Sequence, residues 1–162
     1  VWGTALPRQP GSEAIVVHAP SNPAVCHTAE LVAYVVERKI PTIKVSGKSH
    51  LETMNLKLQG NIGFDHLRGS FSVNTLENAL LGLAPLGVLR PEYREILWRR
   101  GFPPPPDTLA PTPADVWRNL DTLVANPERH AFMQSAARAW VLEGYSPNVI
   151  GARLACYFRG LL

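Results

Sequence analysis

Four short hydrophobic segments alternate with longer segments that predict helices in the first part of the chain. Each short segment is rich in apolar or β-branched residues and lacks the polar alternation of a half-exposed strand, which is typical of strands buried on both faces of a parallel sheet. Predicted strands are Ala14–Ala19, Pro41–Ser46, Asn61–Asp65 and Pro85–Leu89. Predicted helices are residues 28–38, a helix opened by Ser49, residues 72–81 and residues 91–100. The alternation predicts an α/β fold, a Rossmann-like three-layer sandwich.

The remainder of the chain predicts additional C-terminal helices. Four consecutive prolines, Pro103–Pro106, favour an extended segment that cannot join a central strand. Helix starts are expected at Thr112-Pro113 and Asn126-Pro127, where a capping residue precedes proline. The second of these helices would run to Glu143 and be stopped by Gly144.

Apolar residues on these last helices predict buried faces. In the helix from Pro127 the expected face is Phe132, Met133, Ala136 and Trp140. In a final helix opened by Ser146-Pro147 it is Ile150, Leu154, Tyr157 and Phe158. All four tryptophans are expected to pack, namely Trp2, Trp98, Trp117 and Trp140.

Composition is that of a globular domain with a modest positive charge. The 162 residues are 46% hydrophobic and 18% charged, with a net charge of +3, so residues 14–162 are expected to form one domain. Residues 1–13 are interpreted as a linker from another domain. The sequence lacks a basic stripe interleaved with exposed aromatic residues, the pattern that would indicate a nucleic-acid partner. The arginines fit a phosphate-bearing small molecule or peripheral contact with an anionic membrane, but those at 94, 99 and 100 are interpreted as a solvated face rather than as a membrane or lipid-phosphate site.

Cysteine usage and hydropathy predict a cytoplasmic protein. Cys26 and Cys156 lie far apart without metal-ligand spacing, so reduced thiols and no metal are expected. No apolar run is long enough to span a bilayer, and residues 1–11 do not resemble a signal peptide.

Candidate chemistry lies in the loops that follow the predicted strands, because ligands of open parallel sheets bind beyond the strands' carboxyl ends. The loop Gly69-Ser70-Phe71-Ser72 leads into a helix whose free N–H groups suit phosphate, and Glu77 could accept hydrogen bonds from ribose hydroxyls. Asn74-x-x-Glu77 could instead be a capping box, a purely structural role. The other loops contribute Ser21 and Asn22, Gly47, Lys48 and Ser49, Asp65 and His66, and Arg90.

The histidines differ in their expected roles. His18 is interpreted as a hydrogen-bonded core residue, His66 as a site candidate, and His50 and His130 as surface residues. Ser72 has no evident His–acid partner for nucleophilic catalysis.

Three stretches, taken in order, resemble the donor-binding C-terminal half of retaining GT-B glycosyltransferases. FDHLRGSFSVNTLENALLGLAPLGVLRPEY resembles the family's Glu-x7-Glu region, in which a glycine-rich loop enters a helix and is followed by A/G-x-P and a short strand. VVHAPSNPAVCHTAE resembles its first strand and helix start, and NPERHAFMQSAARAWVLEGYSPNVIGARL its closing helices.

This resemblance implies a domain that binds a nucleoside-diphosphate sugar, without a cofactor, and works with a separate N-terminal acceptor domain in the cytoplasm or at the inner face of a membrane. By resemblance, Glu77 would bind ribose and the backbone of Ser72, Val73 and Asn74 the diphosphate. Gly47 and Ser49 would flank the base, and Lys48 or Arg90 would supply positive charge. Catalytic residues are not identified, and the isolated domain is expected to be inactive.

Three departures from the family pattern favour an alternative, a decayed glycosyltransferase that serves as an interaction module. Gly69 stands where the family has its first glutamate, Cys26 stands at the family's lysine, and one strand–helix unit is missing before the Ser49 helix. Lys44, Lys48 or Arg90 could replace the lysine. A flavodoxin-like or receiver domain ranks last, because the acidic cluster of receivers is missing after the first strand.

Overall fold

The alternating pattern produces the α/β architecture that it predicts. In the computed structural model, which describes residues 13–159, the order is five strands interleaved with and followed by helices. The strands are β1 (Val16–His18), β2 (Thr42–Lys44), β3 (Ile62–Phe64), β4 (Ala84–Val88) and β5 (Leu109–Ala110). The helices are α1 (Thr28–Glu37), α2 (His50–Lys57), α3 (Val73–Leu80), α4 (Pro91–Arg99), α5 (Pro113–Ala125), α6 (Pro127–Tyr145) and α7 (Pro147–Arg159).

All four strand pairs are parallel, and the sheet order is β2-β1-β3-β4-β5. This is the order of flavodoxin-like doubly wound folds. The flavodoxin-like alternative therefore has the observed strand order, although strand order alone says nothing about function.

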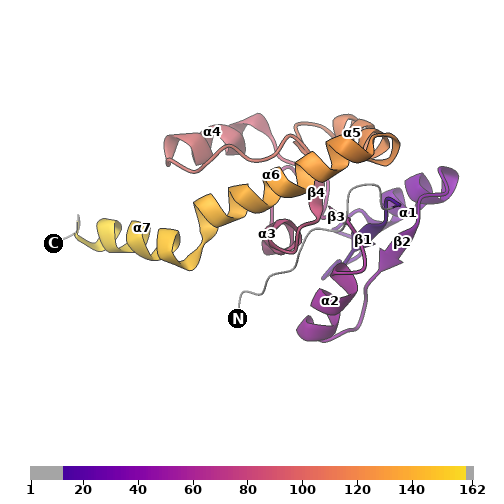
Figure 1. The fold of residues 1–162 in the computed structure, drawn as a ribbon, viewed down its shortest axis with the longest axis horizontal. Coiled ribbons are helices and arrows are strands. Elements are labelled where there is room, and N and C mark those ends of the chain that lie inside the picture. Colours follow the sequence, from indigo (N-terminus) through magenta and orange to yellow (C-terminus); the bar gives the residue numbers. More distant parts are fainter. Residues whose placement is uncertain (1–12, 160–162) are drawn as a thin grey trace.

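Helices cover both faces of the sheet, as Figure 1 shows. Alternate residues of β1 enter different clusters: Val16 packs with α1 and α5, whereas Val17 packs on the opposite face near Leu56 of α2. α3 packs against β3 and β4. The result is the predicted three-layer sandwich, with a core formed by β1, β3, β4 and β5, whose residues are all buried. The edge strand β2 was expected to be buried on both faces, but its residues are only partly buried or exposed.

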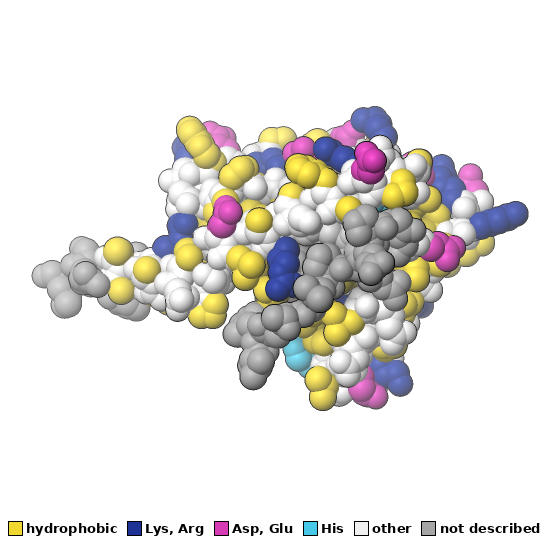
Figure 2. All heavy atoms as spheres, viewed as in Figure 1, with side chains coloured by type: hydrophobic (Ala, Val, Ile, Leu, Met, Phe, Trp, Pro, Cys, Tyr) yellow, Lys and Arg dark blue, Asp and Glu magenta, His cyan; other side chains and the backbone are white. Residues whose placement is uncertain are grey.

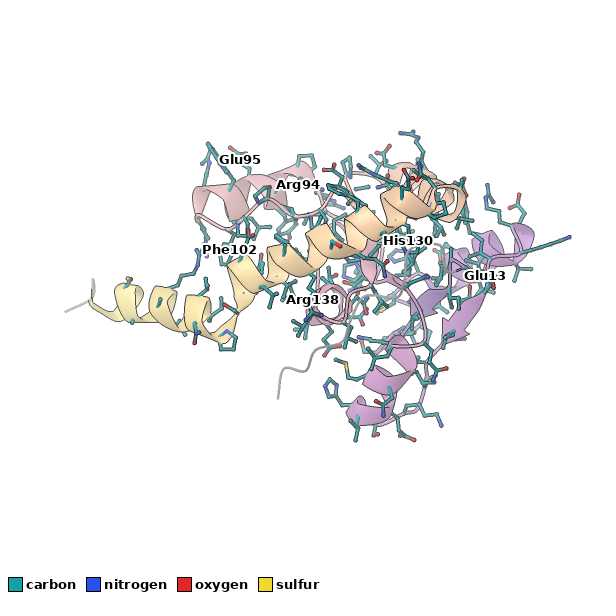
Figure 3. The ribbon with its side chains drawn as sticks, in the orientation of Figure 1. Glu13, Arg94, Glu95, Phe102, His130 and Arg138 are labelled. Carbon is teal, nitrogen blue, oxygen red and sulfur yellow. The ribbon has the colours of Figure 1, made fainter. Side chains whose placement is uncertain are left out.

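α6 crosses the molecule and contacts α3, α5 and β4 (Figure 1). His130 Nε2–H donates to the backbone oxygen of Asn61 at 3.1 Å, and Gln134 Nε2 donates to that of Gly82 at 2.7 Å. Asn61 and Gly82 precede β3 and β4, so α6 satisfies carbonyls at the amino ends of these strands. Figure 3 labels His130 and Arg138 along α6. This arrangement leaves the carboxyl ends of the strands available for a site.

Several expectations for the last helices are wrong. α6 continues through Gly144 to Tyr145. Glycine is needed inside the helix at this position because it faces Pro103 with no room for a side chain. His130 is buried rather than exposed, while Phe132, Trp98 and Leu154 are 61%, 74% and 52% exposed.

Other expectations have mixed outcomes. Met133 and Trp140 are buried, and Trp117 stacks on Tyr34 and Phe64. Arg94 does not belong to a solvated face, because its guanidinium donates to the backbone oxygens of Pro105, Pro106 and Leu109, and burial lowers its pKa. Trp2, the side chains of Tyr157 and Phe158, and all of the predicted linker except Glu13 lie outside the described residues.

Candidate functional site

A cleft of about 460 Å³ lies at the carboxyl ends of β1 and β3. The loop after β1, the loop after β3, the first turns of α3 and one side of α2 form its walls. Its lining residues are Ala19, Pro20, Ser21, Val25, Cys26, Thr53, Lys57, Asp65, His66, Arg68, Ser72, Val73, Asn74 and Glu77. Six of the residues predicted for the site are therefore brought together here: Asp65, His66, Ser72, Val73, Asn74 and Glu77.

The position of this cleft follows from the order of the strands. β1 and β3 are neighbours, and the chain leaves β1 toward β2 on one side but leaves β3 toward β4 on the other. Such a reversal separates the two loops and opens a crevice, where open α/β sheets bind their ligands. The cleft is thus where a ligand is expected on topology alone.

The amino end of α3 is occupied by a carboxylate of the protein itself. Asp65 Oδ2 accepts from the Ser72 N–H at 3.2 Å and from the Ser72 hydroxyl at 2.8 Å. The Thr75 hydroxyl also donates to Oδ2, and Asn74 Nδ2 donates to Oδ1 at 3.3 Å. Asp65 is only 5% exposed, so its negative charge is stabilised by these donors and by the positive end of the helix dipole.

This arrangement changes the predicted roles of the loop. Ser72 caps α3, because its Oγ accepts from the Asn74 N–H at 3.0 Å, and its capping-box partner is Thr75. The proposed Asn74–Glu77 capping box is therefore wrong. Of the three N–H groups predicted for a diphosphate, those of Ser72 and Asn74 are engaged within the protein.

Glu77 lines the cleft and forms an ion pair that the sequence did not reveal. Its Oε2 accepts from Lys57 Nζ at 2.6 Å, and its Oε1 lies 3.9 Å from Nδ1 of His50. Lys57 also donates to Asn74 Oδ1 at 2.6 Å. The Lys57 side chain is 1% exposed and that of Glu77 is 24% exposed, so the carboxylate keeps an accessible edge.

Lys57 occupies the one fully inward position of α2. The leucines at its two ends are exposed instead: Leu51 is 71% exposed, and Leu58, which follows the last turn, is 43% exposed. The sequence gives only a weak indication that Lys57 belongs to the site. It lies one helical turn after Thr53, which also lines the cleft, and just ahead of Gly60.

The loop after β2 forms a second hollow beside the cleft. This hollow of about 280 Å³ is lined by Gly47 and Lys48, and it shares Pro20, Ser21 and Thr53 with the cleft. Ser49 does not line it but opens α2, as predicted, and forms a capping box with Glu52. The two hydrogen bonds from Ser49 lower the pKa of Glu52.

Gly69, Ser70 and Arg90 lie behind the cleft rather than in its lining. Gly69 has φ +98°, and a Cβ added there would lie 2.5 Å from Nε of Arg90. The Arg90 N–H also donates to the Gly69 carbonyl at 2.8 Å. A glutamate at position 69 would need both a strained backbone and displacement of Arg90.

The loops after β1 and β3 supply further polar groups. Nε2 of His66 lies 3.9 Å from Oδ2 of Asp65, and its Nδ1 accepts from the Arg68 N–H at 3.3 Å. Arg68 and Cys26, which were not selected for the site, also line the cleft. Asn22 is a turn former as expected, since its Oδ1 accepts from the Ala24 N–H at 3.1 Å.

Two acidic and two basic side chains thus face one cleft, with the valines at 25 and 73 among its apolar lining. Carboxylate oxygens accept hydrogen bonds from hydroxyl groups, and an arginine at the rim can contact an anion. Within residues 13–159 no group of three or more His, Cys, Asp or Glu side chains is placed to hold a metal ion. The described helices include none long and apolar enough to cross a bilayer.

Comparisons with protein-family models, with curated proteins and with solved structures find no match for this chain.

Proposed function

We propose that this domain binds a nucleoside-diphosphate sugar and serves as the donor-binding half of a glycosyltransferase that transfers the sugar to a glycan, a lipid or another acceptor. The observation that carries the proposal is Glu77: a half-buried carboxylate at the topological switch point, held by Lys57 with one edge open to the cleft. By the resemblance described above, the acceptor would bind to a separate domain and the protein would act in the cytoplasm.

The hydroxyl-binding part of the proposal rests on the geometry of Glu77. Lys57 fixes Oε2, which leaves Oε1 and the second lone pair of each oxygen to accept from vicinal ribose hydroxyls. Because the lysine neutralises the carboxylate, the pair presents acceptor atoms without the full repulsion that an isolated carboxylate would exert on a nearby phosphate.

The diphosphate must be placed differently from the arrangement expected from the sequence. Asp65 occupies the start of α3, so we assign the phosphates to Arg68 at the cleft and Lys48 at the adjoining hollow. Both side chains belong to exposed residues and can reach an anion without burying an unpaired charge. Gly47 lines the hollow in which the base would lie.

Calorimetric titration of uridine and guanosine diphosphates, with their 2′-deoxy and 3′-deoxy analogues, tests the proposal. The wild-type chain should bind the ribose form of one diphosphate more tightly than its deoxy forms. In Glu77→Gln that preference should largely vanish, a change of about tenfold or more, because a hydrogen bond to a charged acceptor contributes about 1.5–3 kcal/mol.

Glu92→Gln is the matched control, since Glu92 is an exposed residue in the first turn of α4. Its ribose preference should equal that of the wild type. Arg68→Gln should weaken binding of the diphosphate and leave binding of the nucleoside unchanged. Absence of binding by every nucleotide, with a folded chain, would overturn the proposal.

The second candidate function is an interaction module that retains the fold without binding a donor. The observation in its favour is Asp65, whose carboxylate takes the place of a phosphate at the start of α3. Asp65→Asn keeps an acceptor oxygen for Ser72 but removes the charge. If the module interpretation is right, neither the wild type nor Asp65→Asn binds a nucleotide; if a phosphate approaches α3, Asp65→Asn binds the diphosphate more tightly.

A further inference from the structure

An apolar groove lies far from the cleft, where α7 leaves the body of the molecule. Figure 1 shows α7 extending beyond the sandwich at the end of α6, on the side of the molecule that also carries α4. The groove has a volume of about 600 Å³ and is lined by Arg100, Phe102, Ile150, Ala152, Arg153, Leu154 and Cys156. Phe102 is labelled at this end of the molecule in Figure 3.

The apolar residues of α7 are only partly covered by the rest of the described chain. Ile150 and Leu154 are spaced by one helical turn, the pattern that predicts a buried face, yet Leu154 is 52% exposed. Figure 2 shows hydrophobic side chains along α7 on the face in view. On the neighbouring helix α4, Trp98 is 74% exposed and Ile96 is 46% exposed.

The groove is positioned by contacts of an arginine with the end of α4. Arg153 donates to the backbone oxygens of Arg100 at 2.8 Å and Gly101 at 2.7 Å, and its guanidinium lies 4.0 Å above the ring of Phe102. These bonds satisfy carbonyls at the carboxyl end of α4, where a cation is favoured by the helix dipole. α7 is therefore held at a defined place beside α4.

The charged side chains of α7 and of the groove lining are all basic. From Gly144 to the last residue the sequence contains Arg153 and Arg159 and neither Asp nor Glu. The ionisable side chains that line the groove, apart from Cys156, are Arg100 and Arg153. Arg99 follows Trp98 at the end of α4 and is exposed, although Glu95 pairs with it at 2.6 Å.

We propose that the α4–α7 groove and the exposed side of α7 bind the surface of a membrane that contains anionic lipids. Amphipathic helices that lie in the plane of a membrane combine Leu, Phe and Trp on one side with Arg and Lys on the other. Leu154 and Ile150 enter the interface, and Arg100 faces the anionic head groups, where each arginine adds attraction. This proposal does not depend on binding of a nucleotide in the cleft.

Sedimentation with vesicles of phosphatidylcholine containing about one third phosphatidylserine tests the apolar contribution. Leu154→Glu places a carboxylate in the lining of the groove and should lower the partition coefficient by about tenfold or more, equivalent to about 1.4 kcal/mol. Phe132→Glu is the matched control, because Phe132 is 61% exposed but lies near the other end of α6. Equal binding by the wild type and Leu154→Glu would overturn the proposal.

A second pair of variants tests the charge. Arg100→Gln should weaken binding to the anionic vesicles by about fivefold, since one basic residue near such a surface contributes about 1 kcal/mol. It should not change the weaker binding to vesicles of phosphatidylcholine alone. Arg118→Gln, which alters an exposed arginine of α5, should bind like the wild type.

Sedimentation velocity without vesicles distinguishes a second copy of the chain from a lipid surface. The proposal expects a monomer for both the wild type and Leu154→Glu at the concentrations used with vesicles. A wild-type dimer that dissociates in Leu154→Glu, together with no vesicle binding, would show that another copy covers the groove and would overturn the proposal.

Discussion

Lys57 carries a charge in a position that is 1% exposed, and two oxygen atoms compensate for its burial. Taking an ammonium group out of water costs several kcal/mol, which is recovered only when the partners are close and well oriented. Both partners, Asn74 and Glu77, belong to α3, whereas Lys57 belongs to α2. The ion pair therefore joins the two helices that form one wall of the cleft.

Removing one member of this pair should cost more than removing both. Glu77→Ala leaves a buried ammonium group with only Asn74, and we expect a loss of about 3 kcal/mol in the free energy of unfolding. The double variant Lys57→Met, Glu77→Leu should recover most of that loss and lie within about 1 kcal/mol of the wild type. Urea unfolding followed by circular dichroism measures all three.

Glu92→Ala supplies the control for an exposed glutamate near a helix start and should change the stability by no more than about 0.5 kcal/mol. Additive losses from Lys57→Met and Glu77→Leu would show that the two side chains are not energetically coupled.

Part of the site is predictable from the sequence because its residues follow a predicted parallel strand, not because their side chains form a recognisable motif. Asp65, His66 and Glu77 were selected since they follow β3, and ligands gather at the carboxyl ends of parallel strands. The rule about strand ends does not predict that the Asp65 carboxylate occupies the start of α3. The loop turns back at Gly69, and this turn brings Asp65 to Ser72, seven residues later. Lys57 is not predictable from the pattern, because α2 buries this lysine while Leu51 is exposed and Leu56 is only partly buried.

At the scale of elements, the loop between β3 and α3 depends on a left-handed glycine. Gly69 has φ +98° and contacts the side chain of Arg90, whereas Gly47, with φ +65°, has no atom within 4 Å of an added Cβ. The positive φ at both positions disfavours residues other than glycine, but only at Gly69 would a side chain also collide with a neighbour. Comparing substitutions at the two positions therefore separates backbone strain from steric conflict.

Gly69→Ala should therefore destabilise the protein more than Gly47→Ala. We expect about 2–3 kcal/mol for Gly69→Ala, from the backbone strain and the displacement of Arg90. Gly47→Ala should cost about 1 kcal/mol from the left-handed conformation alone. Thermal and urea unfolding measure both, and an equal or smaller cost at position 69 would contradict the contact with Arg90.

Most elements are predictable from local pattern, and the failures have tertiary causes. The four strand–helix units appear with ends that differ by at most two residues from those predicted. β5 was missed because two residues, Leu109 and Ala110, carry too little pattern after the prolines. α6 was expected to stop at Gly144, where glycine normally ends a helix, but packing against Pro103 makes glycine necessary inside the helix.

Gly144→Ala and Gly151→Ala should have effects of opposite sign. A Cβ at Gly144 would lie 2.8 Å from Cδ of Pro103, so we expect a loss of about 1–3 kcal/mol from overpacking. At Gly151 in α7 nothing lies within 4 Å, so alanine should stabilise the helix by up to about 1 kcal/mol. Urea unfolding of both variants measures the difference, and stabilisation by Gly144→Ala would contradict the close packing of α6 on Pro103.

At the scale of the whole molecule, two buried histidines connect the sheet to the helices that cover it. His18 in β1 accepts from the Thr28 hydroxyl of α1 at 2.8 Å and lies 3.4 Å from the Phe64 oxygen of β3. His130 in α6 donates to the Asn61 oxygen ahead of β3. Burial is the first cause that lowers the pKa of each ring below 6.5. Burial therefore favours the neutral form of both rings, and the contact of His18 with Thr28 requires it, because a protonated imidazole has no acceptor nitrogen.

A lowered pKa in the folded state fixes the direction of the pH dependence. The unfolded chain binds a proton near pH 6.5, before the folded chain does, so these histidines favour unfolding as the pH falls below that value. The free energy of unfolding should decrease between about pH 7 and pH 5.

In His130→Gln, whose amide can still donate to the Asn61 oxygen, the decrease should be smaller than in the wild type. His50→Gln should retain the wild-type slope, because the His50 side chain is 75% exposed. Urea midpoints at half-unit pH intervals measure the slopes. Since α6 satisfies carbonyls at the amino ends of the strands through His130, equal slopes in His130→Gln and the wild type would mean that this ring does not stay neutral when it is buried.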